Sequence, residues 1–152
     1  DLADYRNQKV GFIFQQFNLI STLSALENVA MPLAIAGVDS IERNSRALRA
    51  LKSVGLEQRV KHKPGELSGG EQQRVSIARA IVNEPKIILA DEPTGNLDSA
   101  TGQDIIELLS NLNSQQGVVV IVATHAAEVA SRTRRMIKLA DGKIIEDSKQ
   151  KE

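Results

Sequence analysis

Two stretches decide the fold: residues 67–74, LSGGEQQR, and residues 86–93, KIILADEP. In the first, a glycine pair opens a helix, so unpaired backbone N–H groups and the positive end of a helix dipole can meet a phosphate oxygen. In the second, a short apolar run ends in two carboxylates, Asp91 and Glu92. Acids at the carboxyl end of a buried strand lie where open α/β sheets bind ligands, and they can supply a Mg²⁺ ligand and a base. The two stretches together indicate nucleotide hydrolysis.

Size and composition indicate one soluble domain, or a large piece of one. A chain of 152 residues buries about two thirds of its unfolded surface, enough for a core. The 19 basic and 19 acidic residues give a formal net charge of +0, which argues against nucleic acid as a partner. The absence of cysteine excludes disulfides and thiolate metal sites and fits a reducing cytosol. No apolar run approaches the roughly 20 residues of a membrane span, so we expect membrane contact only through a partner.

Three short apolar runs predict buried strands: residues 10–14, 87–90 and 118–123. The first is too short for its pattern alone to exclude a helix. The third, VVVIVA, is continuously apolar and largely β-branched, which is typical of a central parallel strand covered on both faces. Farther on, the Asp141-Gly142 pair predicts a hairpin turn between strands at residues 135–139 and 143–145. We expect the charged tail from Glu146 onward to be frayed.

Helical spacing is found before and after the first of the two deciding stretches. Residues 26–36 predict a helix that is interrupted at Pro32. Residues 39–42 have the form of a capping box. The helix that they open would have these apolar residues broadly on one face: Ile41, Leu48, Leu51 and Val54. A third helix would follow the glycine pair and stop before Pro85, and a fourth would follow Asp98.

Five motifs, in this order along the chain, resemble those of ABC-type ATPases. They are the Q-loop glutamine Gln15, the signature motif at residues 67–72, the Walker B strand at residues 87–92, the D-loop at residues 95–98, GNLD, and the H-loop histidine His125. One departure is Ala126, where the family often has an acid, and it leaves the role of the histidine intact. The resemblance covers nearly the whole chain. The amino-acid sequence of the motifs is most similar to that of the family branch that serves lipoprotein-release, macrolide-efflux and cell-division-type transporters.

The resemblance implies an α/β fold: the C-terminal part of a P-loop NTPase core of the RecA-like type, with a mostly parallel sheet and an inserted helical subdomain. It divides the chain into three parts. A core strand and the Q-loop would occupy residues 1–17, and the helical subdomain would occupy residues 18–66. Residues 67–152 would hold the signature helix and the C-terminal part of the core. The surface of the subdomain near the Q-loop would dock a transmembrane permease.

The resemblance also assigns catalytic and metal-binding roles. Glu92 would polarise the attacking water, and Asp91 would hold Mg²⁺ through water. Gln15, a candidate for both catalysis and metal binding, would sense the metal and the water. His125 would contact the γ-phosphate of ATP. Phosphoryl transfer depends largely on positioning and charge stabilisation, so this mixed set of acids and donors is chemically sensible.

The signature would bind the nucleotide of a partner subunit. The resemblance assigns this contact to Ser68 and the amides of Gly69 and Gly70, with Glu71 in the same binding set. Ser68 and Glu71 also have the form of a capping box, which satisfies N–H groups without any ligand. We favour phosphate contact, with capping as a compatible second role, because two glycines let a ligand approach the backbone. Asp98 would cap its own helix and line the boundary between subunits.

One expected motif is absent: the phosphate-cradling loop G-x-x-x-x-G-K-[ST]. The only Gly-Lys pair is Gly142-Lys143, which lacks the upstream glycine and is followed by Ile144. That loop supplies the β- and γ-phosphate cradle and a hydroxyl ligand for Mg²⁺. We therefore interpret the chain as the C-terminal part of an ATPase subunit and expect it to bind ATP poorly by itself. The complete protein would use ATP and Mg²⁺.

For the complete protein, the resemblance implies ATP hydrolysis that powers transport. Its partners would be a transmembrane permease and a second ATPase subunit in a head-to-tail dimer, without nucleic acid and without direct membrane insertion. The location would be cytoplasmic, peripheral on the inner face of the cell membrane. Two alternatives remain open: a non-catalytic fragment that lends its signature in trans to a partner with an intact P-loop, and a soluble ABC-type ATPase that acts on DNA or ribosomes rather than in transport.

Overall fold

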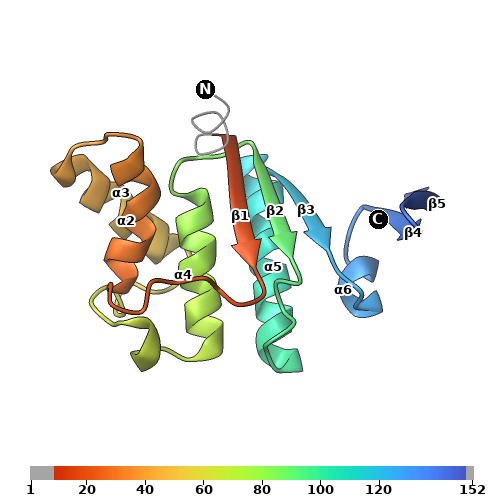
Figure 1. The fold of residues 1–152 in the computed structure, drawn as a ribbon, viewed down its shortest axis with the longest axis horizontal. Coiled ribbons are helices and arrows are strands. Elements are labelled where there is room, and N and C mark those ends of the chain that lie inside the picture. The colour runs from red at the N-terminus through yellow and green to blue at the C-terminus, as the bar shows by residue number, and fades with distance from the viewer. Residues whose placement is uncertain (1–8, 150–152) are drawn as a thin grey trace.

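The structure, a computed structural model, describes residues 9–149 (Figure 1). Its elements are β1 (Val10–Phe14), α2 (Ala25–Ile35), α3 (Ser40–Ser53), the 3₁₀ turn η1 (Pro64–Glu66), α4 (Gly69–Ile81), β2 (Ile87–Asp91), α5 (Ser99–Gln116), β3 (Val119–Ala123), α6 (Ala127–Ser131), β4 (Arg135–Ala140) and β5 (Lys143–Lys149). The outer ends of the predicted segments 1–17 and 67–152 lie outside the described residues. Within the described part, no helix combines the length and the apolar character needed to cross a bilayer.

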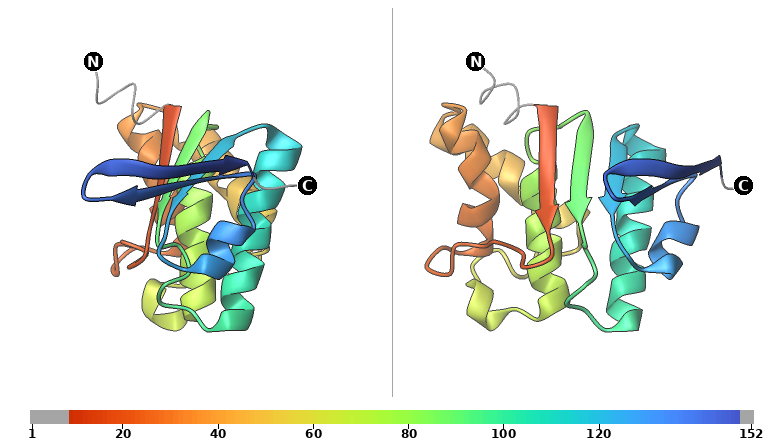
Figure 2. Two further views of the ribbon diagram at one scale, coloured as in Figure 1. Left: turned by 90° about the vertical axis from the view of Figure 1, so that its right-hand side faces the viewer. Right: turned by 45° about the vertical axis from the view of Figure 1, so that its right-hand side comes forward.

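Three parallel strands form the main sheet in the order β1-β2-β3. Helices α4 and α5 lie on one face of this sheet (Figures 1 and 2), and the side chains of Ile13, Ile88 and Ala90 are at most 2% exposed in the core. Because the strands run the same way, their carboxyl ends meet at one edge, where α4 and α5 also begin (Figure 1). The predicted α/β fold with a parallel sheet is confirmed, and residues 10–14 form a strand.

The opposite face of the sheet is uncovered in the described chain. Phe12 and Phe14 of β1 are 40% and 38% exposed, and Val119 and Ile121 of β3 are 51% and 52% exposed. The prediction of a central strand at residues 118–123, covered on both faces, is therefore wrong here. β3 ends the sheet, and its apolar run has a partner layer on one side only. Such a run is typical of strands that are buried on both faces, and nothing in residues 9–149 packs on the second face.

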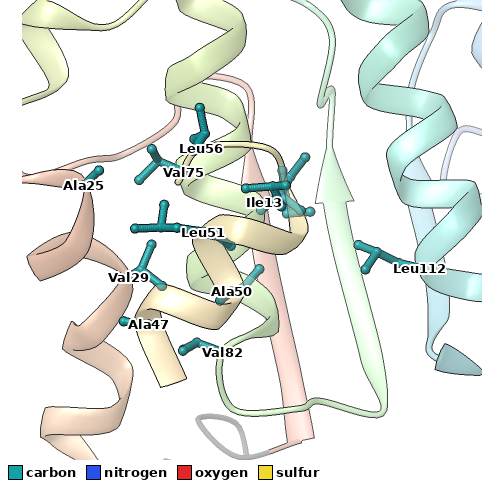
Figure 3. Close-up of a cluster of buried hydrophobic side chains, with 14 of the residues drawn as sticks. Ile13, Ala25, Val29, Ala47, Ala50, Leu51, Leu56, Val75, Val82 and Leu112 are labelled. Carbon is teal, nitrogen blue, oxygen red and sulfur yellow. The ribbon is translucent and has the colours of Figure 1, made fainter. Parts of the chain in front are cut away.

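The largest part of the core lies between α2, α3 and α4 (Figure 3). Val29, Leu51 and Val75, one from each helix, are fully buried there. Asp39 caps α3, as predicted, and accepts the N–H groups of Ile41 and Glu42 at 3.0 and 3.2 Å. These bonds satisfy two N–H groups of the first turn of α3 that have no partner within the helix.

Only half of the apolar face predicted for α3 is buried. Leu51 and Val54 are buried, but Ile41 is 82% exposed and Leu48 is 44% exposed. Small residues take their place in the core: Ala47 and Ala50 are 0% and 8% exposed. Alanine contributes little to a hydrophobic pattern, yet it allows a helix to approach its neighbours closely. The pattern of large apolar residues alone therefore does not show which face of the helix is buried.

Helix α2 is continuous through Pro32, so the predicted interruption is wrong. Ser24 opens the helix with a capping box, in which its backbone N–H donates to Glu27 at 2.7 Å. Proline removes one backbone donor from a helix. Here the burial of Val29 and Leu33, both 0% exposed, holds the helix together and outweighs that loss.

The C-terminal hairpin forms as predicted but extends farther. Asp141 and Gly142 make its turn with φ values of 49° and 72°. β5 continues to Lys149, so the tail from Glu146 is paired rather than frayed up to that residue. The guanidinium of Arg135 donates to both oxygens of Asp147 at 2.8 and 2.6 Å, and this two-point ion pair joins β4 to β5.

Helix α4 approaches the sheet closely at Gly11. A Cβ atom on Gly11 would collide with the backbone carbonyl of Ala80 in α4. Backbone atoms of two packed elements cannot move aside as a flexible side chain can. The absence of a side chain at Gly11 thus sets how near the signature helix lies to β1.

Gly11→Ala should therefore lower the free energy of unfolding by about 1–3 kcal/mol, the usual effect of overpacking. Gly65→Ala is the matched control, because a Cβ there would meet nothing within 4 Å and the backbone is not left-handed. Urea unfolding of both variants and the parent chain measures the difference. Equal stability of the Gly11 and Gly65 variants would contradict the close contact.

Candidate functional site

The candidate site lies where the three parallel strands end. The strand register aligns Phe14, Asp91 and Ala123. Directly after these positions come Gln15, Glu92 and the pair Thr124-His125. Residues predicted from three separate parts of the sequence thus leave the sheet at one edge, which is the edge where open parallel sheets bind ligands.

Glu92 and His125 are in direct contact. One carboxylate oxygen of Glu92, Oε1, accepts the backbone N–H of His125 at 2.8 Å and lies 2.6 Å from Nδ1 of its ring. The other oxygen, Oε2, accepts the hydroxyl of Thr124 at 2.9 Å. Thr124 also accepts the N–H of Ala126 at 3.0 Å. The sequence analysis missed Thr124, whose only signal is its place between a β-branched strand and the histidine.

The backbone of Glu92 is held in an unusual conformation. Its φ is 44°, in the left-handed region that residues other than glycine seldom adopt. Its N–H donates to the carbonyl of Ala123 at 2.9 Å, and its own carbonyl accepts the N–H of Gly95 at 3.0 Å. Such strain persists only where the surroundings impose it, and it is concentrated at functional sites.

The same contacts determine the ionisation of Glu92. Partial burial by itself would raise the pKa of this carboxyl group. The hydrogen bonds from the His125 backbone, the Thr124 hydroxyl and the His125 ring outweigh burial, so the pKa of Glu92 is lower than its usual value. The side chain, 20% exposed, is therefore a carboxylate at neutral pH and is available as a base.

Gln15 is tied to the D-loop. Its side-chain amide donates to Oδ1 of Asn96 at 3.3 Å, and the amide of Asn96 donates to the Gln15 carbonyl at 2.9 Å. Gly95 leaves room for this pairing, because a Cβ there would lie 2.6 Å from Nε2 of Gln15. The Q-loop and the D-loop motifs, 81 positions apart in the chain, are thus neighbours in space.

Asp91 ends β2 with an exposed side chain that has no hydrogen-bond or ion-pair partner among residues 9–149. A Mg²⁺ ion takes six oxygen ligands and usually keeps several waters, so one carboxylate and one amide oxygen fit part of its shell. No group of three or more acidic, histidine or cysteine side chains that could hold a metal occurs in the described residues. The metal-binding roles of Asp91 and Gln15 therefore stay predictions.

The signature motif forms the start of α4 through the capping box seen in the sequence. The Ser68 hydroxyl accepts the N–H of Glu71 at 3.2 Å, and the Glu71 carboxylate accepts the N–H of Ser68 at 2.8 Å. The other oxygen of Glu71 accepts from Arg59 at 3.0 Å. Both oxygens of Glu71 are thus used within this chain. The N–H groups of Gly69 and Gly70 find no acceptor in the described residues and remain available to an anion.

The glycine pair also has a packing role that sequence analysis missed. A Cβ on Gly70 would lie 2.5 Å from Cγ2 of Thr101 in α5, and one on Gly69 would lie 3.3 Å from Leu97. Asp98, between these two contacts, caps α5 as predicted and accepts the Thr101 N–H at 3.0 Å and its hydroxyl at 2.6 Å. These bonds from Thr101 lower the pKa of Asp98. The start of the signature helix therefore packs directly on the D-loop.

Glu92→Gln should make stability less dependent on pH. Because the pKa of Glu92 is lowered from 4.5 by folding, its carboxylate stabilises the chain above that pH, and this contribution is lost as the pH falls through the folded-state pKa. We expect the variant to be about 1 kcal/mol less stable at neutral pH, and the difference to vanish in acid. Urea unfolding across the acidic range measures it. Glu107→Gln, an exposed change on α5, is the control, and a pH-independent difference at Glu92 would refute the prediction.

Comparison with known sequences identifies relatives of this chain. Residues 2–95 match the sequence model of the ABC transporter family. The chain is 52% identical over 147 residues to the macrolide export ATP-binding/permease protein MacB of Mannheimia succiniciproducens, an alignment that covers 97% of this chain and 23% of that protein. It is 50% identical over 145 residues to the uncharacterized ABC transporter ATP-binding protein YknY of Bacillus subtilis, covering 95% of this chain and 63% of that protein. The chain thus spans less than two thirds of the length of either relative.

The solved structures that resemble this chain are also of an ATP-binding cassette. A dimeric post-hydrolysis state of the ATP-binding cassette MJ0796, bound to ADP and Pi, matches with a TM-score of 0.86 and 49% identity, over 99% of this chain and 67% of that one. A second dimeric structure of MJ0796, described as a bacterial ABC transporter cassette, matches with a TM-score of 0.86 and 50% identity. Motif order, fold and these similarities together show that the chain belongs to the ABC transporter family.

Proposed function

We propose that this chain is the C-terminal part of an ATP-binding and ATP-hydrolysing subunit that powers an ABC transporter. The observation that carries the proposal is the contact between Glu92 and His125 at the shared strand edge. Glu92 polarises the attacking water, and its lowered pKa keeps it ionised for that role. His125, whose side chain is 89% exposed, can turn from Glu92 toward a γ-phosphate, and this frees an acceptor position for the water on Oε1, which keeps its hydrogen bond from the His125 backbone.

Asp91 and Gln15 would serve the metal. The carboxylate of Asp91 has no partner among residues 9–149, and the Gln15 side chain is held by a long hydrogen bond of 3.3 Å that a better partner can replace. Mg²⁺ would supply charge stabilisation of the transferring phosphoryl group. The remaining ligand and the phosphate cradle belong to the P-loop, whose motif does not occur in this sequence.

The uncovered face of the sheet supports the proposal that a further part of the cassette completes this one. Phe12, Phe14 and Ile121 expose apolar surface on that face, although their strands are as apolar as strands buried on both sides. The YknY relative is longer than the aligned region, which covers 63% of it. We propose that the P-loop-bearing part packs on this face and so comes next to the strand ends.

The signature would act on the nucleotide of a second subunit. Support comes from the N–H groups of Gly69 and Gly70, which lack acceptors here, and from the dimeric state of the MJ0796 cassette. Ser68 would join them at the γ-phosphate. Glu71 would contribute by holding the cap, because its oxygens are already bonded to Ser68 and Arg59. Asp98 would link the two sites through the D-loop contact with the signature helix.

The partners follow from the same proposal. Residues 18–66 would form the helical subdomain and, with the Q-loop in residues 1–17, dock a transmembrane permease, while residues 67–152 would hold the signature helix and the C-terminal part of the core. The MacB relative is described as an ATP-binding/permease protein, which supports a membrane partner. The protein would then work in the cytoplasm on the inner face of the membrane. In such an assembly, changes in the permease reach the site through Gln15.

Glu92→Gln in the full-length protein should still bind ATP, with affinity within about threefold of wild type, but should hydrolyse it about 10²–10⁴-fold more slowly. The amide cannot act as a base, while the neutral isostere leaves the fold in place. ATP binding and phosphate release are measured on the same preparation, with Glu107→Gln as the control. Wild-type turnover in the Glu92 variant would remove Glu92 from the role of base.

The protein purified from its native source should have a mass well above the 16.5 kDa of this chain. Intact mass spectrometry decides this. A larger mass would assign the ATPase function to the complete subunit. A mass of 16.5 kDa would favour the alternative, a non-catalytic fragment that lends its signature in trans, and ATPase activity would then appear only on mixing with a partner that has an intact P-loop.

A further inference from the structure

Gln73, in the second turn of α4, is a buried polar residue that none of the five motif roles explains. Its side chain is 0% exposed. The amide nitrogen donates to the carbonyl of Pro93 at 2.5 Å and to the carbonyl of Phe14 at 3.4 Å. Pro93 follows Glu92, and Phe14 precedes Gln15. A single amide group thus joins the signature helix to the two chain segments that carry the proposed base and the metal-sensing glutamine.

The other end of the same side chain shows that this contact is not incidental. The oxygen Oε1 of Gln73 is buried and has no hydrogen-bond partner among the described residues. A buried amide oxygen without a partner is unfavourable, and an apolar side chain of the same length would avoid that penalty. The amide nitrogen is therefore the functional end of Gln73, because its two hydrogen bonds are what compensates for the free-energy cost of burying the amide.

The turns that Gln73 holds are the strained parts of the site. Glu92 has a φ of 44°, and Phe17 and Asn18, just after Gln15, have φ values of 61° and 50°. From the same helix, the guanidinium of Arg79 donates to the carbonyls of Phe17 and Asn18 at 2.8 and 2.6 Å. Helix α4 thus holds the Q-loop on both sides of Gln15, and Gln73 extends that hold to the turn after Glu92.

We propose that Gln73 is a positioning residue for ATP hydrolysis: by bridging the carbonyls of Phe14 and Pro93, it keeps Gln15 and Glu92 in fixed relation to the signature helix. The inference rests on the proposed ATPase function. Without the bridge, the turn after Glu92 relaxes toward ordinary φ values and moves the carboxylate away from the attacking water. Any movement of the signature helix is likewise transmitted to both residues through Gln73, and to the Q-loop through Arg79 as well.

The test uses the full-length protein with Gln73→Met, which preserves length and volume and removes both the bridge and the orphaned oxygen. The matched control is Ser76→Ala, on the same helix, which removes the other buried polar group without a partner. For Gln73→Met we expect kcat to fall about 10- to 100-fold, KM for ATP to stay within about threefold, and the urea midpoint not to fall. Ser76→Ala should match wild type in all three.

Amide hydrogen exchange provides a readout that does not depend on activity. The N–H of Gly95 bonds to Glu92 across the Pro93 turn, and the N–H of Phe17 bonds to the same Phe14 carbonyl that Gln73 holds. Both should exchange about tenfold faster in Gln73→Met and at the wild-type rate in Ser76→Ala. If Gln73→Met does not fold, Gln73→Asn replaces it, since the shorter amide can reach at most one carbonyl and should also lower kcat.

Each outcome decides between the two proposals. Lower kcat together with faster exchange at Gly95 and Phe17 supports the positioning role. Wild-type kcat and wild-type exchange in the Gln73 variant overturn it, as does an equal loss in Ser76→Ala. A wild-type protein without ATPase activity would count against the proposed function, and the exchange rates would then still decide whether Gln73 holds the two turns.

Discussion

The register of the three parallel strands is the constraint on which the rest of the structure depends. Pairing aligns Phe14 with Asp91 and Asp91 with Ala123, so the residues that follow each strand leave the sheet side by side. A slip by one position would send every side chain to the other face. The buried set that includes Ile13 and Ile88 excludes such a slip, and the core thereby places the candidate site.

Helix α4 holds the segments that follow these strands in place. Gly11 allows the helix to lie against β1, its N-terminus packs on the D-loop at Gly70, and its side chains reach the Q-loop and the turn after Glu92. Most of these contacts run from a side chain to a backbone carbonyl, so they fix the path of the main chain. A site that works by positioning needs this kind of support, because small displacements strongly reduce rates.

Residues 9–149 leave one face of the sheet uncovered. This face exposes Phe12, Phe14, Val119 and Ile121, and the described residues hold no group of three or more acidic, histidine or cysteine side chains that could bind a metal. Both features occur at the same sheet, and both are consistent with the longer relatives of the ABC transporter family. A single further segment would both cover the apolar surface and supply further metal ligands, which would explain why the two features occur together.

The sequence by itself determined the caps at Asp39 and Asp98 and the short buried strands, because these depend on local hydrogen bonding and on apolar patterns along the chain, while its resemblance to a known family implied the parallel α/β fold and the motif residues. Only the tertiary structure decided that β3 has one open face, that α3 buries Ala47 rather than Ile41, and that Gln73 bridges two carbonyls. Each of these depends on which distant segment lies opposite a residue. A pattern along one chain records how apolar a residue is, but not which neighbour it meets.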